Sequence, residues 1–121
     1  MINSNISIQD RTEKFAIRCI NAYTEINKMN HFNSAAVVLS KQFLRSSTSI
    51  GANCSEAKYA QSRKDFLSKY LISLKEANEC RYWINLLIKS HLVPENKFNP
   101  LLQELTEIIN ILIATTKKLK E

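Results

Sequence analysis

The chain has 121 residues and carries 17 Lys or Arg against 11 Asp or Glu, which gives a formal net charge of +6 at pH 7. Its single Gly and two Pro are too few for the turns of a β-sandwich or barrel, and one Gly cannot build the glycine-rich phosphate loop of a nucleotide-binding βαβ fold. A hydrophobic content of 45% is enough for one packed core, so we expect a single domain over residues 1–121.

The cellular compartment can be inferred from targeting signals and from the number and spacing of the cysteines. The opening MINSNISIQD has neither the basic nor the apolar region of a signal peptide, and no apolar stretch approaches the 18 residues of a membrane span. Cys19, Cys54 and Cys80 are odd in number and far apart, which is untypical of a disulfide framework. We therefore expect a cytoplasmic protein whose cysteines are small buried hydrophobes, with a reactive thiol as the alternative.

Apolar residues recur every three or four positions over four segments, which is the pattern of amphipathic helices. The first predicted helix covers about residues 10–29 and the second about 34–59. The third covers about 62–90 and begins with a short capping box at Ser62 and Asp65. The fourth covers about 99–120, with Pro100 at its first position and three lysines near its C-terminal end, Lys117, Lys118 and Lys120.

The apolar faces of these helices differ in width. The first helix is predicted to bury a stripe that Ala16, Ile20 and Tyr23 widen: Phe15, Cys19, Ala22, Ile26 and Met29. The fourth is predicted to bury Leu101, Leu102, Leu105, Ile108, Ile109, Leu112 and Ile113. The third carries two adjacent rows, one from Phe66 to Leu87 and one made of Leu67, Leu71, Leu74 and Ile88. A face this wide predicts that the third helix is contacted from two sides.

The middle of the second helix, SSTSIGAN at 46–53, has the composition of a loop. The apolar period nevertheless continues through it in phase. We therefore predict one helix, kinked or closely packed near Gly51, with a broken helix as the alternative. Because the connectors are short, sequential helices should be antiparallel neighbours, and the predicted fold is an all-α, up-down-up-down antiparallel four-helix bundle.

Catalytic and metal-binding patterns are missing where such a bundle usually carries them. Di-iron bundles use Glu-x-x-His, and the residue three positions after Glu25, Glu76, Glu79 and Glu104 is never His. No serine lies on a nucleophile turn. We therefore predict no catalytic residue, no metal and no cofactor. Glu76 and Glu79 lie one turn apart and could act as paired catalytic acids, although ion pairs with neighbouring Arg or Lys are the more ordinary arrangement.

Polar residues lie among apolar ones on the second and third helices. We predict that five of them form a structural polar cluster between these helices or across subunits: Arg45, Asn53, Glu56, Glu76 and Glu79. The excess of positive charge also lies on these two helices. Four cations with Tyr70 beside them could attract phosphate groups without reading sequence: Arg63, Lys64, Lys69 and Lys75. The alternative for these cations is an ordinary solvated surface that keeps the protein soluble.

Residues 39–87 resemble the four-helix bundle family of ribosomal RNA intervening-sequence proteins, also called S23-type proteins. The resemblance rests on Leu44-Arg45, Ser49-Ile50-Gly51-Ala52-Asn53, Glu56, Ser62, Lys64-Asp65-Phe66, Glu76, Glu79 and Trp83. The chain departs from the family pattern at Cys54-Ser55, where Ile-Ala is usual, and at Gly51, where Pro is common.

The resemblance implies a bacterial cytoplasmic protein that assembles as a homopentameric ring of bundles. Some family genes lie inside ribosomal RNA intervening sequences, and a related bundle is an accessory protein of diversity-generating retroelements. Both contexts point towards nucleic acid. We therefore expect a non-enzymatic homo-oligomer that binds RNA or single-stranded DNA through a basic surface. The alternative is a scaffold or accessory protein that binds a protein partner.

Overall fold

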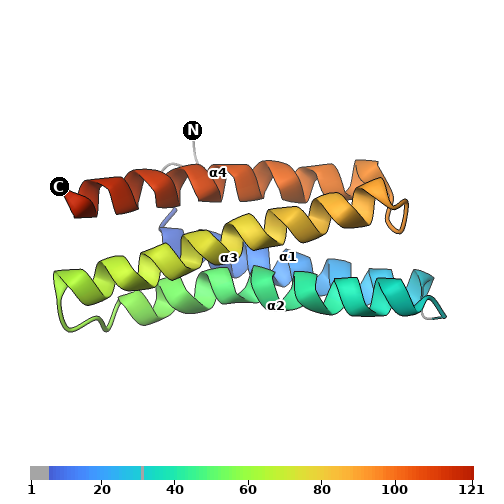
Figure 1. The fold of residues 1–121 in the computed structure, drawn as a ribbon, viewed down its shortest axis with the longest axis horizontal. Helices are drawn as coiled ribbons and strands as arrows, with labels where there is room; N and C mark the ends of the chain where they lie inside the picture. The colour runs from blue at the N-terminus through green and yellow to red at the C-terminus, as the bar shows by residue number, and fades with distance from the viewer. Residues whose placement is uncertain (1–5, 31) are drawn as a thin grey trace.

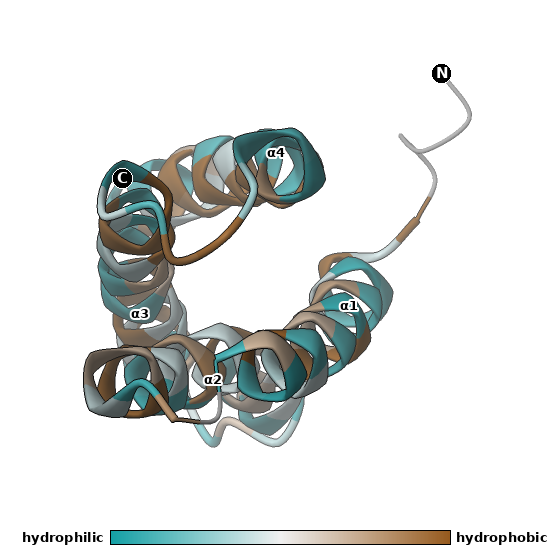
Figure 2. Cartoon of the chain, turned by 90° about the vertical axis from the view of Figure 1, so that its right-hand side faces the viewer, coloured by the Kyte–Doolittle hydropathy of each residue, from teal (hydrophilic) through white to brown (hydrophobic). Residues whose placement is uncertain are grey.

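The computed structural model describes residues 6–30 and 32–121. In this part of the chain the regular structure is four helices and no strand: α1 Ile8–Met29, α2 Ser34–Ala57, α3 Arg63–Lys89 and α4 Glu95–Lys120. Each helix runs alongside the next, and α4 also contacts α1, although Figure 2 shows these two helices as the most widely separated neighbours. The predicted all-α antiparallel four-helix bundle is confirmed. None of the helices in the described residues has the length and apolar character needed to cross a bilayer.

Local sequence signals explain where three of the helices begin. The side chains of Ser7, Asn33 and Ser62 each accept a hydrogen bond from the backbone N–H three residues further on. These N-caps satisfy donors that have no partner within the helix. The N-cap at Ser62 is the one that the capping box in the sequence predicted.

The fourth helix begins four residues before the predicted start at Asn99. Pro94 is its N-cap and Pro100 lies inside it. The additional turn brings Phe98 into the core, where its ring centroid lies 6.2 Å from that of Phe43. Burial of an aromatic side chain outweighs the one backbone hydrogen bond that Pro100 cannot donate.

The core is formed by one stripe from each helix, with Phe15, Phe43, Ile84 and Leu105 almost fully buried. Figure 2 shows the hydrophobic side of each helix along the inside of the bundle. Four residues predicted to lie on covered apolar faces are instead exposed: Ile20, Met29, Leu71 and Ile113. They lie at the edges of their stripes, where a helix already covered on two sides turns away from its neighbours.

The small-residue run lies within one continuous helix, α2, which confirms the single-helix prediction. A Cβ atom on Gly51 would lie 3.2 Å from Thr12 Oγ1 and 3.3 Å from the Thr12 backbone oxygen. Glycine at this position therefore allows α1 to approach α2 closely. Ser46 and Ser47 are buried, and their hydroxyls donate to backbone carbonyls of the preceding turn.

All three cysteines are free and buried, as the sequence predicted. Burial raises the pKa of the Cys19 thiol to about 12 and raises the pKa of Cys54 and of Cys80 as well. A thiol must ionise to act as a nucleophile. The environment of these side chains therefore favours the role of small buried hydrophobes over that of reactive thiols.

Candidate nucleic-acid interface

An ionic cluster joins α2 to α3 on the outside of the bundle. The Arg45 guanidinium donates from Nη1 to Glu76 Oε1 at 3.0 Å and from Nη2 to Glu79 Oε2. The indole Nε1–H of Trp83 donates to the same Glu79 oxygen at 3.0 Å. Three of the five residues predicted to form a polar cluster therefore meet here, and Trp83 joins them.

The other two residues of the predicted cluster lie elsewhere. Asn53 donates to the backbone carbonyl of Ser49 at 2.9 Å, one turn back in its own helix. Glu56 does reach α3, but it accepts from Lys69 Nζ at 2.8 Å. Asn53 and Glu56 lie two to three helical turns beyond Arg45 along α2, which separates them from its two carboxylates.

The environment of Glu79 argues against the paired-acid interpretation of Glu76 and Glu79. The Trp83 hydrogen bond, and then Arg45, hold the pKa of Glu79 below its ordinary value. A catalytic general acid at neutral pH needs the opposite shift. The geometry therefore fits a structural ion pair.

We predict that Arg45→Ala lowers thermal stability more than Lys117→Ala does. The loss should be about 1–2 kcal/mol, because the Arg45 side chain is 45% exposed while Glu76 beneath it is only 15% exposed. Lys117 is exposed, and within residues 6–30 and 32–121 no carboxylate forms an ion pair with it. Thermal melts followed by circular dichroism measure the difference. Equal and negligible shifts would show that the ion pair adds nothing to the fold.

The four cations proposed from the sequence as a nucleic-acid surface have different environments. Arg63 Nε and Nη2 donate to the carbonyls of Leu119 and Lys118 at 3.3 and 3.4 Å. Lys69 is paired with Glu56. Lys64 and Lys75 flank an apolar strip on the outside of α3. The structure therefore does not gather the four into one stripe.

Tyr70 does not provide the aromatic surface that the sequence suggested. It is only 3% exposed, and its hydroxyl accepts a hydrogen bond from Gln9 Nε2 at 3.1 Å. Its position in phase with Ala77 and Ile84 places it on the buried side of α3. A buried ring cannot stack on a base.

The contact from Arg63 to the α4 carbonyls brings together cations that lie more than 50 residues apart in the chain. Figure 1 shows the α2–α3 connection and the C terminus at the same end of the bundle. This basic end contains six exposed cations: Lys58, Arg63, Lys64, Lys117, Lys118 and Lys120. Glu56, Asp65 and Glu121 are the acidic residues closest to them in the chain, and Glu56 is paired with Lys69. Positive charge is therefore in excess here.

Tyr59 lies in the connector between α2 and α3 at this end, directly after Lys58, and is 82% exposed. Apolar periodicity did not single it out, because it follows the last buried residue of α2. Tyr59 could have been identified from the sequence as an aromatic residue that lies in a connector between two cations, Lys58 and Arg63. Exposed aromatic rings of this kind can stack on nucleic-acid bases.

A second ionic cluster, which the sequence analysis missed, links α1 to α4. The Arg11 guanidinium forms a two-pronged contact with Glu104, at 3.0 and 2.8 Å, and reaches Glu107 at 2.6 Å. The Arg11 side chain is only 9% exposed. Its spacing of four from Phe15 and eight from Cys19 indicates a buried position. α1 and α4 share the smallest contact of the four neighbouring pairs, so this cluster carries much of their association.

Comparison with known proteins places the chain in a family. Residues 4–114 match the family described as 23S rRNA-intervening sequence protein. The chain belongs to this family. Its fold is also similar to the crystal structure of a protein of unknown function from the S23 ribosomal protein family of Bacteroides thetaiotaomicron, with a TM-score of 0.84 and 41% identity over 92% of this chain and 99% of that one. No curated protein matches the sequence.

Only part of the basic end lies within the residues that match the 23S rRNA-intervening sequence protein family. The matched residues include Lys58, Arg63 and Lys64, whereas Lys117, Lys118 and Lys120 follow the last matched residue, 114. The α4 part of the surface therefore has to be tested in this chain. Within residues 6–30 and 32–121, no three His, Cys, Asp or Glu side chains gather closely enough to hold a metal ion.

Proposed function

We propose that this protein is a non-enzymatic homo-oligomer, a pentamer of four-helix bundles, that binds RNA or single-stranded DNA through its basic end. The observation that carries the proposal is the hydrogen bonding of Arg63 to the last carbonyls of α4, which joins two groups of cations into one surface. Lys69 and Lys75 are not part of this surface, because Lys69 is already paired and Lys75 lies beside apolar residues.

A surface with this many cations favours the binding of a polyanionic ligand. Lysine and arginine release counterions when they neutralise phosphates, and this contribution to affinity does not depend on base sequence. Tyr59 adds a surface for base stacking, which tolerates any base. Part of the charge at the α4 C-terminus also offsets the helix dipole. A helix C-terminus carries the equivalent of about half a negative charge, so the three lysines there leave an excess for an external ligand.

Assembly would multiply this effect. Each subunit carries a net charge of +6, and a closed oligomer repeats the basic end around its axis. Once one subunit has bound a strand, the neighbouring basic ends act at high effective concentration. A modest affinity per subunit then becomes a useful affinity for the assembly.

The alternative is a scaffold that binds a protein partner. It is favoured by one observation, the apolar strip on α3, since exposed apolar patches mark protein contacts. Apolar residues do not attract phosphates. The two functions therefore predict different ligands, and binding of nucleic acid distinguishes them.

Fluorescence anisotropy with a labelled 20-nucleotide single-stranded RNA tests the proposal. For about six phosphate contacts, affinity should fall by about 10²-fold or more as salt rises from about 50 to 200 mM. A second RNA of unrelated sequence should bind with similar affinity. Absence of binding by the assembled wild type at the lower salt would remove the nucleic-acid function and leave the protein scaffold.

A further inference from the structure

One outward face of α3 is apolar between two lysines. The α3 strip consists of Lys64, Leu67, Ser68, Leu71, Ile72 and Lys75. These residues recur at helical spacing, so they share one side of the helix, and this side points away from the core that Tyr70 and Ala77 face. Leu71 and Ile72 are 36% and 39% exposed. Nothing within the described chain covers this side.

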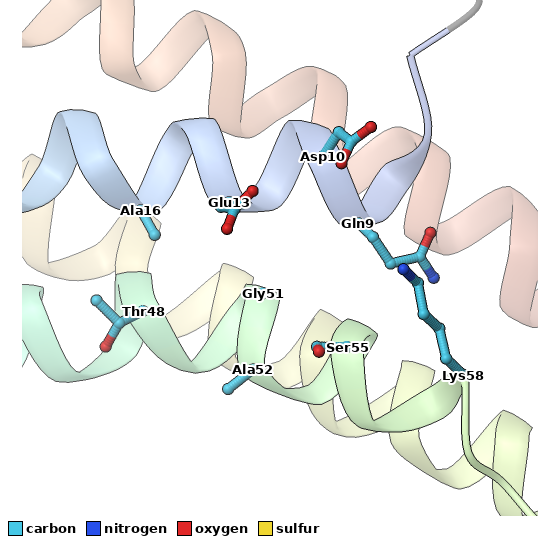
Figure 3. Close-up of a pocket in the computed structure, with 9 residues that line it drawn as sticks. All are labelled: Gln9, Asp10, Glu13, Ala16, Thr48, Gly51, Ala52, Ser55 and Lys58. Carbon is cyan, nitrogen blue, oxygen red and sulfur yellow. The ribbon is translucent and has the colours of Figure 1, made fainter.

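A groove of complementary character lies between α1 and α2. The α1–α2 groove, drawn in Figure 3, has a volume of about 320 Å³ and is lined by Gln9, Asp10, Glu13, Ala16, Thr48, Gly51, Ala52, Ser55 and Lys58. The α2 side is made mostly of small residues. Asp10 and Glu13 come from α1 and add negative charge, and both are exposed.

We infer that the α3 strip of one copy packs into the α1–α2 groove of a second copy, and that this contact builds the homo-oligomer. That the protein is an oligomer is taken from the proposed function. The new element is which two surfaces of neighbouring copies are in contact. A ridge of Leu and Ile side chains fits a groove floored by small side chains, because the small side chains allow close approach of the helices.

The two surfaces lie at the same height along the bundle. Gln9 Nε2 contacts both the Tyr70 hydroxyl, at 3.1 Å, and the Cys54 carbonyl, at 3.4 Å, so these three residues mark one level. Leu71 and Ile72 then lie within about 3 Å of this level along α3, as do Ala52 and Ser55 along α2. Neighbours in a ring whose axis follows the bundle would therefore meet strip against groove.

The charges match at a second level. Glu13 lies about 6 Å beyond Gln9 along α1, and Lys75 lies about 7.5 Å beyond Tyr70 along α3, in the same direction, because alternate helices of the bundle are parallel. Ile20 and Tyr82 match further along, at about 16.5 and 18 Å. Both are exposed apolar side chains in a single copy. The contact would pair Lys75 with Glu13 and cover the exposed apolar side chains of Ile20 and Tyr82.

The contact would use two different surfaces of each copy. α3 and the α1–α2 groove lie on different sides of the bundle, as Figure 2 shows for the helices, so the contact is heterologous, and a copy whose strip is occupied still offers its groove to the next copy. Such a contact closes into a ring when the rotation between neighbouring copies divides a full turn, as the proposed pentamer requires. Lys58 of one copy and Lys64 of the next would then lie near each other at the rim, where their mutual repulsion opposes the contact until an anion binds between them. The basic ends of neighbouring subunits would form one continuous surface.

Light scattering at micromolar concentration tests the α3 strip. The wild type should have a mass that is a multiple of the 13.9 kDa chain, and the double variant Leu71→Glu/Ile72→Glu should fall to the single-chain mass with an unchanged helical circular dichroism spectrum. Ile113→Glu, an equally exposed apolar position on α4, should keep the wild-type mass. A wild-type oligomer that both variants leave intact overturns this interface but not the homo-oligomer. A wild-type monomer overturns both.

Carbodiimide cross-linking of the unmodified protein tests the α1–α2 groove as the partner surface. Activation of Glu13 and attack by Lys75 Nζ would form an amide, with the carbodiimide taking up the water as a urea. The Glu13–Lys75 product should join two different chains in a mixture of ¹⁴N- and ¹⁵N-labelled protein. Glu56–Lys69, 2.8 Å apart in one chain, is the internal control. Recovery of the control product without any Glu13–Lys75 product overturns the inference.

Discussion

Arg11→Ala should lower the melting temperature by about 10 °C, corresponding to a loss of about 2–3 kcal/mol. Arg11 is almost buried, and its removal leaves Glu104, with a side chain only 21% exposed, without the partner that offsets its desolvation. The loss of the ion pair with Glu107 should cost less stability, because the Glu107 side chain is 60% exposed and remains solvated. Since α1 and α4 share the smallest helix contact, few other interactions can compensate.

Lys14→Ala is the matched control for Arg11, because Lys14 lies about one turn along α1, is exposed and has no carboxylate partner in the described part of the chain. Its melting temperature should stay near that of the wild type. The double variant Arg11→Met/Glu104→Leu should recover much of the loss, because neither charge is then left unpaired. If Arg11→Ala and Lys14→Ala shift the melting temperature equally at the same protein concentration, the α1–α4 link carries no special stability.

Neutralising the basic end should weaken RNA binding by about 10²-fold in low salt. The variant carries Arg63→Gln, Lys117→Gln, Lys118→Gln and Lys120→Gln, which removes four of the six cations and leaves both the α3 strip and the α1–α2 groove intact. The slope of log affinity against log salt should fall by about 3, since each lost phosphate contact on a single strand accounts for about 0.7. Anisotropy titrations at several salt concentrations measure both quantities.

The chain offers a control with the same change of charge. Lys28, Lys41, Lys89 and Lys97 are exposed and lie in the opposite half of the bundle. Changing these four to Gln also reduces the formal net charge from +6 to +2, and it should leave affinity within a few-fold of the wild type. Equal losses in both variants would mean that net charge, and not the basic end, determines binding.

The sequence predicted the elements that depend on local signals and periodicity. Ser62 begins α3 because its hydroxyl caps the helix, and Phe43, Ile50 and Cys54 lie in the core because their spacing puts them on one face. The continuity of α2 through its small residues followed from the same spacing. The pairing of Arg45 with Glu76 and Glu79 was accessible because polar residues stood among apolar ones on two neighbouring helices.

What depends on tertiary contact could not be read from the sequence. The early start of α4 is decided by the packing of Phe98 on Phe43, which no local signal encodes. Ile20 has the spacing of a core residue. Its side chain is nevertheless exposed, because α2 and α4 already cover the buried side of α1. The basic end exists because the last turn of α4 lies against the first residue of α3. The two residues in contact, Arg63 and Lys118, are 55 positions apart in the sequence.

Ultraviolet cross-linking of bound RNA, followed by mass spectrometry of the cross-linked peptides, tests the central claim most directly. The bundle has a highly exposed aromatic residue near each end, Tyr59 at the basic end and Phe32 at the other, 82% and 93% exposed. Binding through the basic end predicts cross-links to the peptide that contains Tyr59 and to residues around Lys117 and Lys118. Cross-links confined to the peptide that contains Phe32 would contradict the account.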